Sequence, residues 1–171
     1  CNASAALSAL KSQSRPFCPS TTWVHAPLVR VATAGLPSIM ASAIASGLED
    51  EGVPVRIIDI QKNHHSDVMT ELADCGAVIV GSATHNNNVL PGIADVLTYM
   101  KGLRPLNRVG AAFGSYGWSG ESPKIIQEWL ASMNMDMPAA PVKCLFVPKH
   151  EGLSQCVALG KTVAEALKAK C

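Results

Sequence analysis

The stretch that decides the fold is Arg108-Val109-Gly110-Ala111-Ala112-Phe113-Gly114-Ser115-Tyr116-Gly117-Trp118-Ser119-Gly120-Glu121. Its first part is short and apolar, which predicts a buried strand over Arg108 to Phe113. The second part, Gly114 to Glu121, predicts a loop whose glycines let the backbone come close to a ligand, because glycine has no Cβ. Tyr116 and Trp118 add flat apolar surface in a chain that is only 5% aromatic. Such a loop suits a planar heteroaromatic ligand.

A second loop of similar character precedes it in the chain. The run Ala77-Val78-Ile79-Val80-Gly81 is apolar throughout, which is typical of a central parallel strand covered by helices on both faces. The polar segment Ser82-Ala83-Thr84-His85-Asn86-Asn87-Asn88 follows it directly. Ligands of open parallel sheets bind at the carboxyl ends of the strands. We therefore expect the binding site in the loops after the first, third and fourth strands.

Outward from these two segments, short apolar runs alternate with helical patterns from Pro27 to the end of the chain. This alternation predicts an α/β protein built of βαβ units around a parallel sheet. Ser66 and Asp67 are the expected cap of a short helix. The other strands are expected at 28–32, 53–60 and 143–147, and the helices at 38–51, 68–73, 90–100, 119–133 and 152–169.

Composition limits the function classes. A chain of 171 residues with 48% apolar residues accommodates one domain with a sizeable core. The formal net charge of +1 gives no electrostatic reason to expect nucleic acid or an anionic membrane as partners. No apolar run reaches the roughly 18 to 20 residues that a membrane-spanning helix needs. The six cysteines show no CxxC pair or zinc-ligand spacing, so we expect free thiols and no metal site.

The first part of the chain has a different composition. No acidic residue occurs before Glu49, and Ala, Ser, Lys and Arg dominate the first fifteen positions. Residues 1–26 are therefore expected to be an interdomain linker or, alternatively, a tail like an organelle transit peptide. The corresponding compartments are the cytoplasm or, in the alternative, a plastid or other organelle.

Three runs carry a resemblance to a known family: Gly81-Ser82-Ala83-Thr84-His85-Asn86-Asn87-Asn88-Val89-Leu90-Pro91, then Tyr99-Met100-Lys101-Gly102-Leu103-Arg104-Pro105, then Gly110 to Glu121. They resemble the flavodoxin-like domain of flavodiiron proteins, or A-type flavoproteins. The resemblance implies that residues 27–171 form a flavodoxin-like three-layer α/β/α sandwich. Its five-stranded parallel sheet would have the order 2-1-3-4-5, with FMN at the carboxyl edge.

The resemblance also implies positions for the flavin. On one side of the isoalloxazine it places Thr84, His85, Asn86 and Asn87. On the other side it places Ser115, Tyr116, Gly117, Trp118 and Gly120. No side chain is expected to act as a catalytic nucleophile or base, because the cofactor carries the chemistry.

The phosphate end of the site departs from the family pattern. The family offers a hydroxyl-rich turn after the first strand, whereas this chain has Ala32-Thr33-Ala34-Gly35-Leu36-Pro37-Ser38. In an ungapped alignment the hydroxyl positions fall on Ala32, Leu36 and Pro37. With a shift of one residue, Thr33 and Ser38 become the first and last hydroxyls around Gly35. The sequence is compatible with the ungapped and with the shifted alignment. Thr33, Gly35 and Ser38 are the candidate phosphate contacts.

The function implied by the resemblance is electron relay. FMN would receive electrons from a rubredoxin or flavin reductase and pass them to a diiron centre that reduces oxygen or nitric oxide. That centre belongs to a metallo-β-lactamase-like domain absent from this sequence, and family members commonly pair into a homo-oligomer. The alternative is a degenerate, flavin-free domain used for assembly or interaction. A self-contained NAD(P)H-dependent flavin or quinone reductase ranks last, because no nicotinamide feature is visible.

Overall fold

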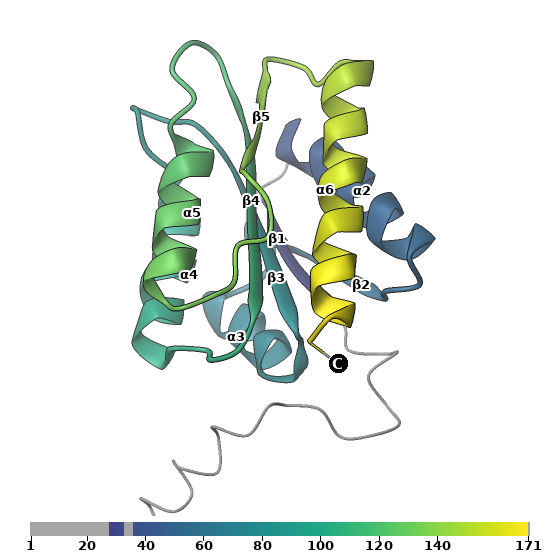
Figure 1. Ribbon diagram of the computed structural model, residues 1–171. Coiled ribbons are helices and arrows are strands. Elements are labelled where there is room, and N and C mark those ends of the chain that lie inside the picture. The colour runs from purple at the N-terminus through teal and green to yellow at the C-terminus, as the bar shows by residue number, and fades with distance from the viewer. Residues whose placement is uncertain (1–27, 33–35, 171) are drawn as a thin grey trace, which may run out of the picture.

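The computed structural model describes residues 28–32 and 36–170 (Figure 1). The predictions for residues 1–26, Thr33 and Gly35 therefore fall outside the described residues. The strands are β1 (Leu28–Ala32), β2 (Val55–Asp59), β3 (Ala77–Ala83), β4 (Val109–Tyr116) and β5 (Val142–Leu145). They form one five-stranded sheet in the order β2-β1-β3-β4-β5, and every neighbouring pair is parallel. The predicted α/β class is confirmed.

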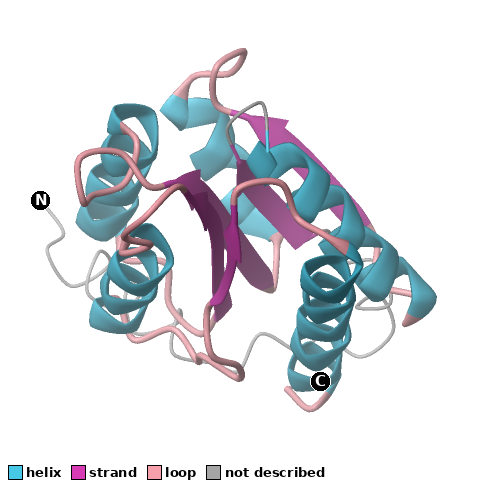
Figure 2. Cartoon of the chain, turned by 90° about the horizontal axis from the view of Figure 1, so that it is seen from above, coloured by secondary structure: helices cyan, strands magenta, loops and turns pink. Residues whose placement is uncertain are grey.

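Helices cover both faces of this sheet, as the view from above shows (Figure 2). On one face lie α2 (Leu36–Asp50) and α6 (His150–Lys168), which pack against each other. On the other face lie α3 (His65–Asp74), α4 (Pro91–Leu103) and α5 (Ser122–Ser132). This arrangement explains why β3 is apolar throughout: both of its faces are buried.

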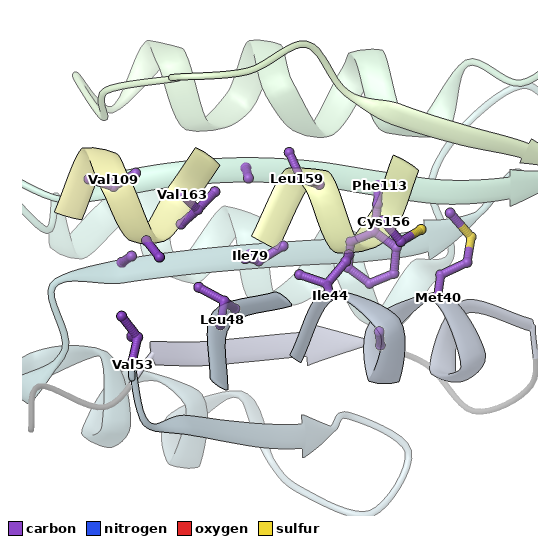
Figure 3. Packing of buried hydrophobic residues seen from close by; sticks show 14 of the residues in the cluster. Met40, Ile44, Leu48, Val53, Ile79, Val109, Phe113, Cys156, Leu159 and Val163 are labelled. Carbon is purple, nitrogen blue, oxygen red and sulfur yellow. The ribbon is translucent and has the colours of Figure 1, made fainter. Parts of the chain in front are cut away.

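Two apolar cores hold the layers together, one on each side of the sheet. The first joins Met40, Ile44 and Leu48 of α2 to Leu159 and Val163 of α6 over the sheet residues Ile79, Val109 and Phe113 (Figure 3). The second packs α3, α4 and α5 on the opposite side chains of β3 and β4. Because β3 and β4 contribute to both cores, they are held from both sides of the sheet. Their carboxyl ends are therefore rigid supports for the loops that follow.

Two predicted boundaries were wrong in an informative way. The strand β4 continues to Tyr116, three residues past the expected end at Phe113, so Gly114 and Ser115 belong to the sheet. The helix α3 begins at His65 and is capped by His64 instead of Ser66 and Asp67. The His64 side chain accepts from the Ser66 N–H, and the Asp67 carboxylate accepts from the His64 N–H at 2.9 Å. A histidine completes this capping box, which is usually closed by Ser or Thr.

The cysteines that the structure describes are thiols that form no disulfide, in agreement with the prediction. Cys75, Cys144 and Cys156 are all buried. Burial raises the pKa of the Cys156 thiol to about 12. Burial also raises the pKa of the neighbouring Cys144 thiol, so both stay protonated at neutral pH. Among the described helices, none is long and apolar enough to cross a membrane.

Candidate functional site

The loops after β3 and β4 lie side by side at the carboxyl edge of the sheet, at the top of Figure 1. The two strands pair in register up to Ala83, the last residue of β3, with Ser82 opposite Gly114 and Ala83 opposite Ser115. Just beyond β3, the Thr84 N–H donates to the Ser115 carbonyl at 2.8 Å. The sheet pairing therefore fixes the start of both predicted loops against each other.

A small hydroxyl network joins the same two segments to the start of α5. The hydroxyls of Thr84 and Ser122 are hydrogen-bonded at 2.9 Å, across 38 positions of sequence. The Ser122 hydroxyl also donates to the Ser82 carbonyl at 3.2 Å, and Ser122 is fully buried. Ser82 in turn accepts from the Leu90 N–H at 3.0 Å. Thr84, a predicted flavin contact, is thus held by the protein itself.

Replacing Ser122 with alanine should lower the free energy of unfolding by about 1–2 kcal/mol, because buried hydrogen-bond partners would be left unsatisfied. Urea denaturation measures this change. The matched control is Ser132→Ala in the last turn of the same helix, where an exposed hydroxyl donates to the Trp129 carbonyl. That substitution should change stability by less than about 0.5 kcal/mol. Equal losses in the two variants would contradict a structural role for the hydroxyl network.

The loop after β3 is a tight turn built on asparagines. His85 and Asn88 exchange backbone hydrogen bonds, each at 2.9 Å. The two residues between them, Asn86 and Asn87, both have positive φ, at 47° and 57°. Such turns require a left-handed backbone at both central residues, and asparagine tolerates it. Ser119 donates to the Asn87 side chain at 3.2 Å, so the tip of this turn contacts the loop after β4.

Two glycines of the predicted loop serve the packing of the protein instead of lying open to a ligand. A Cβ at Gly114 would lie 2.2 Å from the Ser82 carbonyl oxygen, so only glycine allows this approach of β4 to β3. Gly120 has a φ of 75°, and a Cβ there would lie 3.0 Å from the Tyr116 ring. The Tyr116 ring thus packs against Gly120 and closes the loop on itself. At Gly117, the remaining glycine of the loop, an added Cβ would make only an ordinary van der Waals contact, at 3.7 Å from the Phe146 Cε1 atom.

The aromatic residues of the loop differ in exposure. Trp118 is 89% exposed, the largest value among the exposed large apolar side chains of the described residues. Tyr116 is half-buried, and the Lys143 ammonium lies 6.0 Å from the centre of its ring. His85 is exposed, whereas Ser115 is buried within the strand. The structure therefore offers one fully accessible indole beside a polar turn.

The candidate phosphate end lies at the start of α2, which follows β1 at the same edge of the sheet. Ser38 is exposed in the first turn of α2, where no acidic residue occurs. A helix N-terminus favours a phosphate through its backbone N–H groups and dipole. Pro37 in the same turn removes one of those N–H groups.

Two residues near the loops were missed by sequence reasoning. The carboxylate oxygen Oε2 of Glu121 is buried and has no hydrogen-bond partner in the described part of the chain. Phe146, just beyond β5, has a φ of 51° and donates its N–H to the Tyr116 carbonyl at 2.8 Å. Neither feature has a sequence signal, because a side-chain acceptor without a partner and a left-handed phenylalanine both arise from tertiary placement.

His64 and His65, two adjacent histidines, lie at the start of α3, and His65 takes part in a contact between helices. His65 contacts the Asp95 carboxylate at 2.6 Å and its ring packs beside Tyr99, which links α3 to α4. Among residues 28–32 and 36–170, no three His, Cys, Asp or Glu side chains gather as a metal site would require.

Fold and site together define the class of protein. The strand order reverses between β1 and β3, which is the switch point where doubly wound domains bind their ligand. The polar turn after β3 and the aromatic loop after β4 adjoin this point. The chain is therefore a doubly wound α/β domain of the kind that binds a planar nucleotide-like ligand.

The comparison with protein families makes this class specific. The family model described as Flavodoxin matches residues 38–160, so the chain belongs to the flavodoxin family. The flavodoxin-like fold predicted from the resemblance is thereby confirmed. FMN is the cofactor that membership of this family implies, in agreement with the prediction.

Relatives with similar sequences lead to the flavodiiron proteins, the group that the resemblance indicated. The chain is 53% identical over 131 residues to rubredoxin-oxygen oxidoreductase of Megalodesulfovibrio gigas, covering 77% of this chain and 33% of that protein. It is 40% identical over 126 residues to nitric oxide reductase of Moorella thermoacetica, covering 73% of this chain and 32% of that protein. The chain thus spans about a third of the length of these relatives. The resemblance to the flavodoxin-like domain of flavodiiron proteins is confirmed.

Solved structures agree with the sequences. The rubredoxin oxygen:oxidoreductase from Desulfovibrio gigas superimposes with a TM-score of 0.81 at 47% identity, over 86% of this chain and 37% of that one. A flavodoxin from the domain Archaea superimposes with a TM-score of 0.74 at 33% identity, over 83% of this chain and 99% of that one. The second match shows that the same fold occurs as a chain of its own.

Proposed function

We propose that this chain is the FMN-binding electron-transfer domain of a flavodiiron-type oxidoreductase. The observation that carries the proposal is the pairing of Trp118, an indole almost wholly exposed, with a polar turn that the protein fixes beside it. Covering so large an apolar ring with a ligand or partner would remove apolar surface from water, which is favourable. The position of this pair at the switch point of a flavodoxin-family sheet makes the flavin ring the best-fitting ligand.

The residues proposed to hold the flavin divide by the end of the cofactor that they meet. At the ring, Trp118 supplies a stacking surface and the turn after β3 supplies amide and imidazole groups for the polar edge. At the phosphate, the start of α2 supplies backbone N–H groups and a hydroxyl. The proposed cofactor-binding residues are Thr33, Gly35, Ser38, Thr84, His85, Asn86, Asn87, Ser115, Tyr116, Gly117, Trp118 and Gly120.

The site also contains a group that favours a ligand. The Glu121 Oε2 atom is buried without a hydrogen-bond partner among the described residues. A buried acceptor in this condition costs free energy, so turning the carboxylate toward a donor on a bound molecule would stabilise it. Glu121 directly follows the predicted contact Gly120 at the start of α5. We therefore add Glu121 to the residues that support a ligand with hydrogen-bond donors, which FMN has.

The bound cofactor would supply reversible one- and two-electron transfer at neutral pH. The protein's part is to bind and orient the ring, to exclude water from one of its faces, and to place hydrogen-bond groups at its edge. The fixed turn Asn86-Asn87 and the Thr84–Ser122 link suit this task, because they hold polar groups without further ordering on binding. No nucleophile or general base is required of this chain.

The partners follow from the proposed role. Electrons would come from a rubredoxin or flavin reductase and would pass to a diiron centre in a metallo-β-lactamase-like domain of the whole protein. The names of the two relatives, an oxygen oxidoreductase and a nitric oxide reductase, make oxygen and nitric oxide the candidate terminal acceptors. The domain itself is proposed to begin near Pro27, since the first strand of the sheet, β1, begins at Leu28. Residues 1–26 would then be the linker, and a cytoplasmic location remains a prediction.

Reversible reduction of the chain loaded with FMN tests the electron-transfer role. We expect an anaerobic titration with dithionite to bleach the flavin bands and reoxidation to restore them fully, with the flavin still retained on gel filtration. Loss of flavin during the cycle, or an absorbance that does not return, would contradict a relay function.

A further inference from the structure

Phe146 is the described aromatic residue with the least favourable backbone. Its φ of 51° lies in the left-handed region, which a bulky side chain rarely adopts. The other non-glycine residues with positive φ in the described chain are asparagines and Arg104. Phe146 is also 61% exposed, so burial of its ring does not explain the conformation. A strained residue of this kind persists only where the surroundings hold it in place, and such residues cluster at functional sites.

The contacts of Phe146 point to the loop after β4. Its N–H donates to the Tyr116 carbonyl at 2.8 Å, which extends the β4–β5 ladder by one bond. Its ring lies beside Gly117: a Cβ built there would meet the Phe146 Cε1 atom at 3.7 Å and no other heavy atom within 4 Å, chain neighbours aside. The left-handed backbone thus turns the phenyl ring back onto the loop.

The tip of that loop lies between residues that are held on either side. Tyr116 is fixed by β4 and Gly120 by the Tyr116 ring, while Ser119 is tied to Asn87. Between them, Gly117 and Trp118 are exposed and form no regular structure. On the side of Gly117 where a side chain would stand, the Phe146 ring is the group within 4 Å of the Cβ position, chain neighbours aside.

We propose that Phe146 is a positioning residue for the flavin: its ring, held by a strained backbone, fixes Gly117 and thereby the Trp118 indole in the orientation that stacks on the ligand. This inference rests on the proposed FMN site and adds a residue to it from beyond β5. Fixing the loop in advance lowers the conformational entropy lost on binding, which raises affinity. The left-handed backbone at Phe146 lowers the stability of the fold, and the higher affinity for the ligand is gained at this cost.

The proposal predicts opposite changes in stability and affinity for one substitution. Phe146→Asn removes the ring and replaces it with a residue that tolerates left-handed φ. We expect the melting temperature of the flavin-free chain to rise by about 2–4 °C. We expect the FMN dissociation constant, measured by quenching of flavin fluorescence, to increase about tenfold.

Two further variants test whether the changes in affinity and melting temperature come from the Phe146 ring and its backbone. Phe146→Tyr keeps both ring and strain, so its affinity and melting temperature should match those of the unchanged chain. Val147→Asn removes a neighbouring side chain that is 58% exposed and lacks positive φ, and it should alter neither quantity. Unchanged affinity in Phe146→Asn would overturn the positioning role, and a lower melting temperature would overturn the assignment of strain. Failure of the unchanged chain to bind FMN would overturn the proposed function itself, and this inference with it.

Discussion

Replacing Trp118 with alanine is expected to weaken FMN binding roughly thirtyfold and to leave the stability of the flavin-free chain almost unchanged. The indole is 89% exposed, so its removal costs the folded protein little packing. If a stacked flavin covers about 80 Å² of apolar indole surface, the contact contributes ~2 kcal/mol, which corresponds to the stated loss.

Fluorescence titration of FMN and thermal unfolding, run on the same preparations, check both parts of this expectation. The matched control is Leu103→Ala, which removes another large side chain, 58% exposed, at the end of α4. That variant should bind FMN as the unchanged chain does. Unaltered affinity in Trp118→Ala would show that the flavin ring lies elsewhere.

Replacing Gly114 with alanine should destabilise the domain by about 3 kcal/mol, because strain from overpacking cannot relax at this position. The added Cβ would lie 2.2 Å from the Ser82 carbonyl oxygen, a backbone atom held by the pairing of β3 with β4. The same carbonyl accepts the hydrogen bond from the Ser122 hydroxyl. The substitution would therefore disturb the support of both loops as well as the sheet.

Urea denaturation measures this loss, and Gly102→Ala is its control. Gly102 lies in α4, and nothing lies within 4 Å of a Cβ built there. Alanine is favoured over glycine in a helix, so this variant should gain about 0.5 kcal/mol. A similar stability in Gly114→Ala and the unchanged chain would mean that β3 and β4 do not approach as closely as described.

Most of the secondary structure could be predicted from the sequence, because the spacing of the apolar residues and the length of the apolar runs differ between strands and helices. The run Ala77 to Gly81 indicated a strand buried on both faces, and β3 is such a strand. The end of β4 was not predictable from Gly114-Ser115-Tyr116, since glycine and serine usually mark loops. These residues continue the strand because β3 and β5 flank them and pair with them, a tertiary effect that outweighs local preference.

The candidate site was predictable only in part, for a related reason. The resemblance brought together Thr84, Asn87 and the loop after β4, and the structure places these segments in contact. It did not indicate Phe146, and it included Glu121 without assigning its carboxylate a role, because backbone strain and an unpaired acceptor depend on packing between distant segments. The phosphate end stays a prediction, since Thr33 and Gly35 lie outside the described residues.

The most direct measurement is a titration of FMN with the purified chain, followed by flavin fluorescence and visible absorbance. If this domain binds FMN between its fixed turn and the Trp118 loop, fluorescence should be quenched to a single equivalent with a dissociation constant of about 1 µM or tighter. The bound flavin should show a resolved absorption spectrum. No quenching and no bound flavin bands at micromolar protein would contradict the assignment and favour a flavin-free domain.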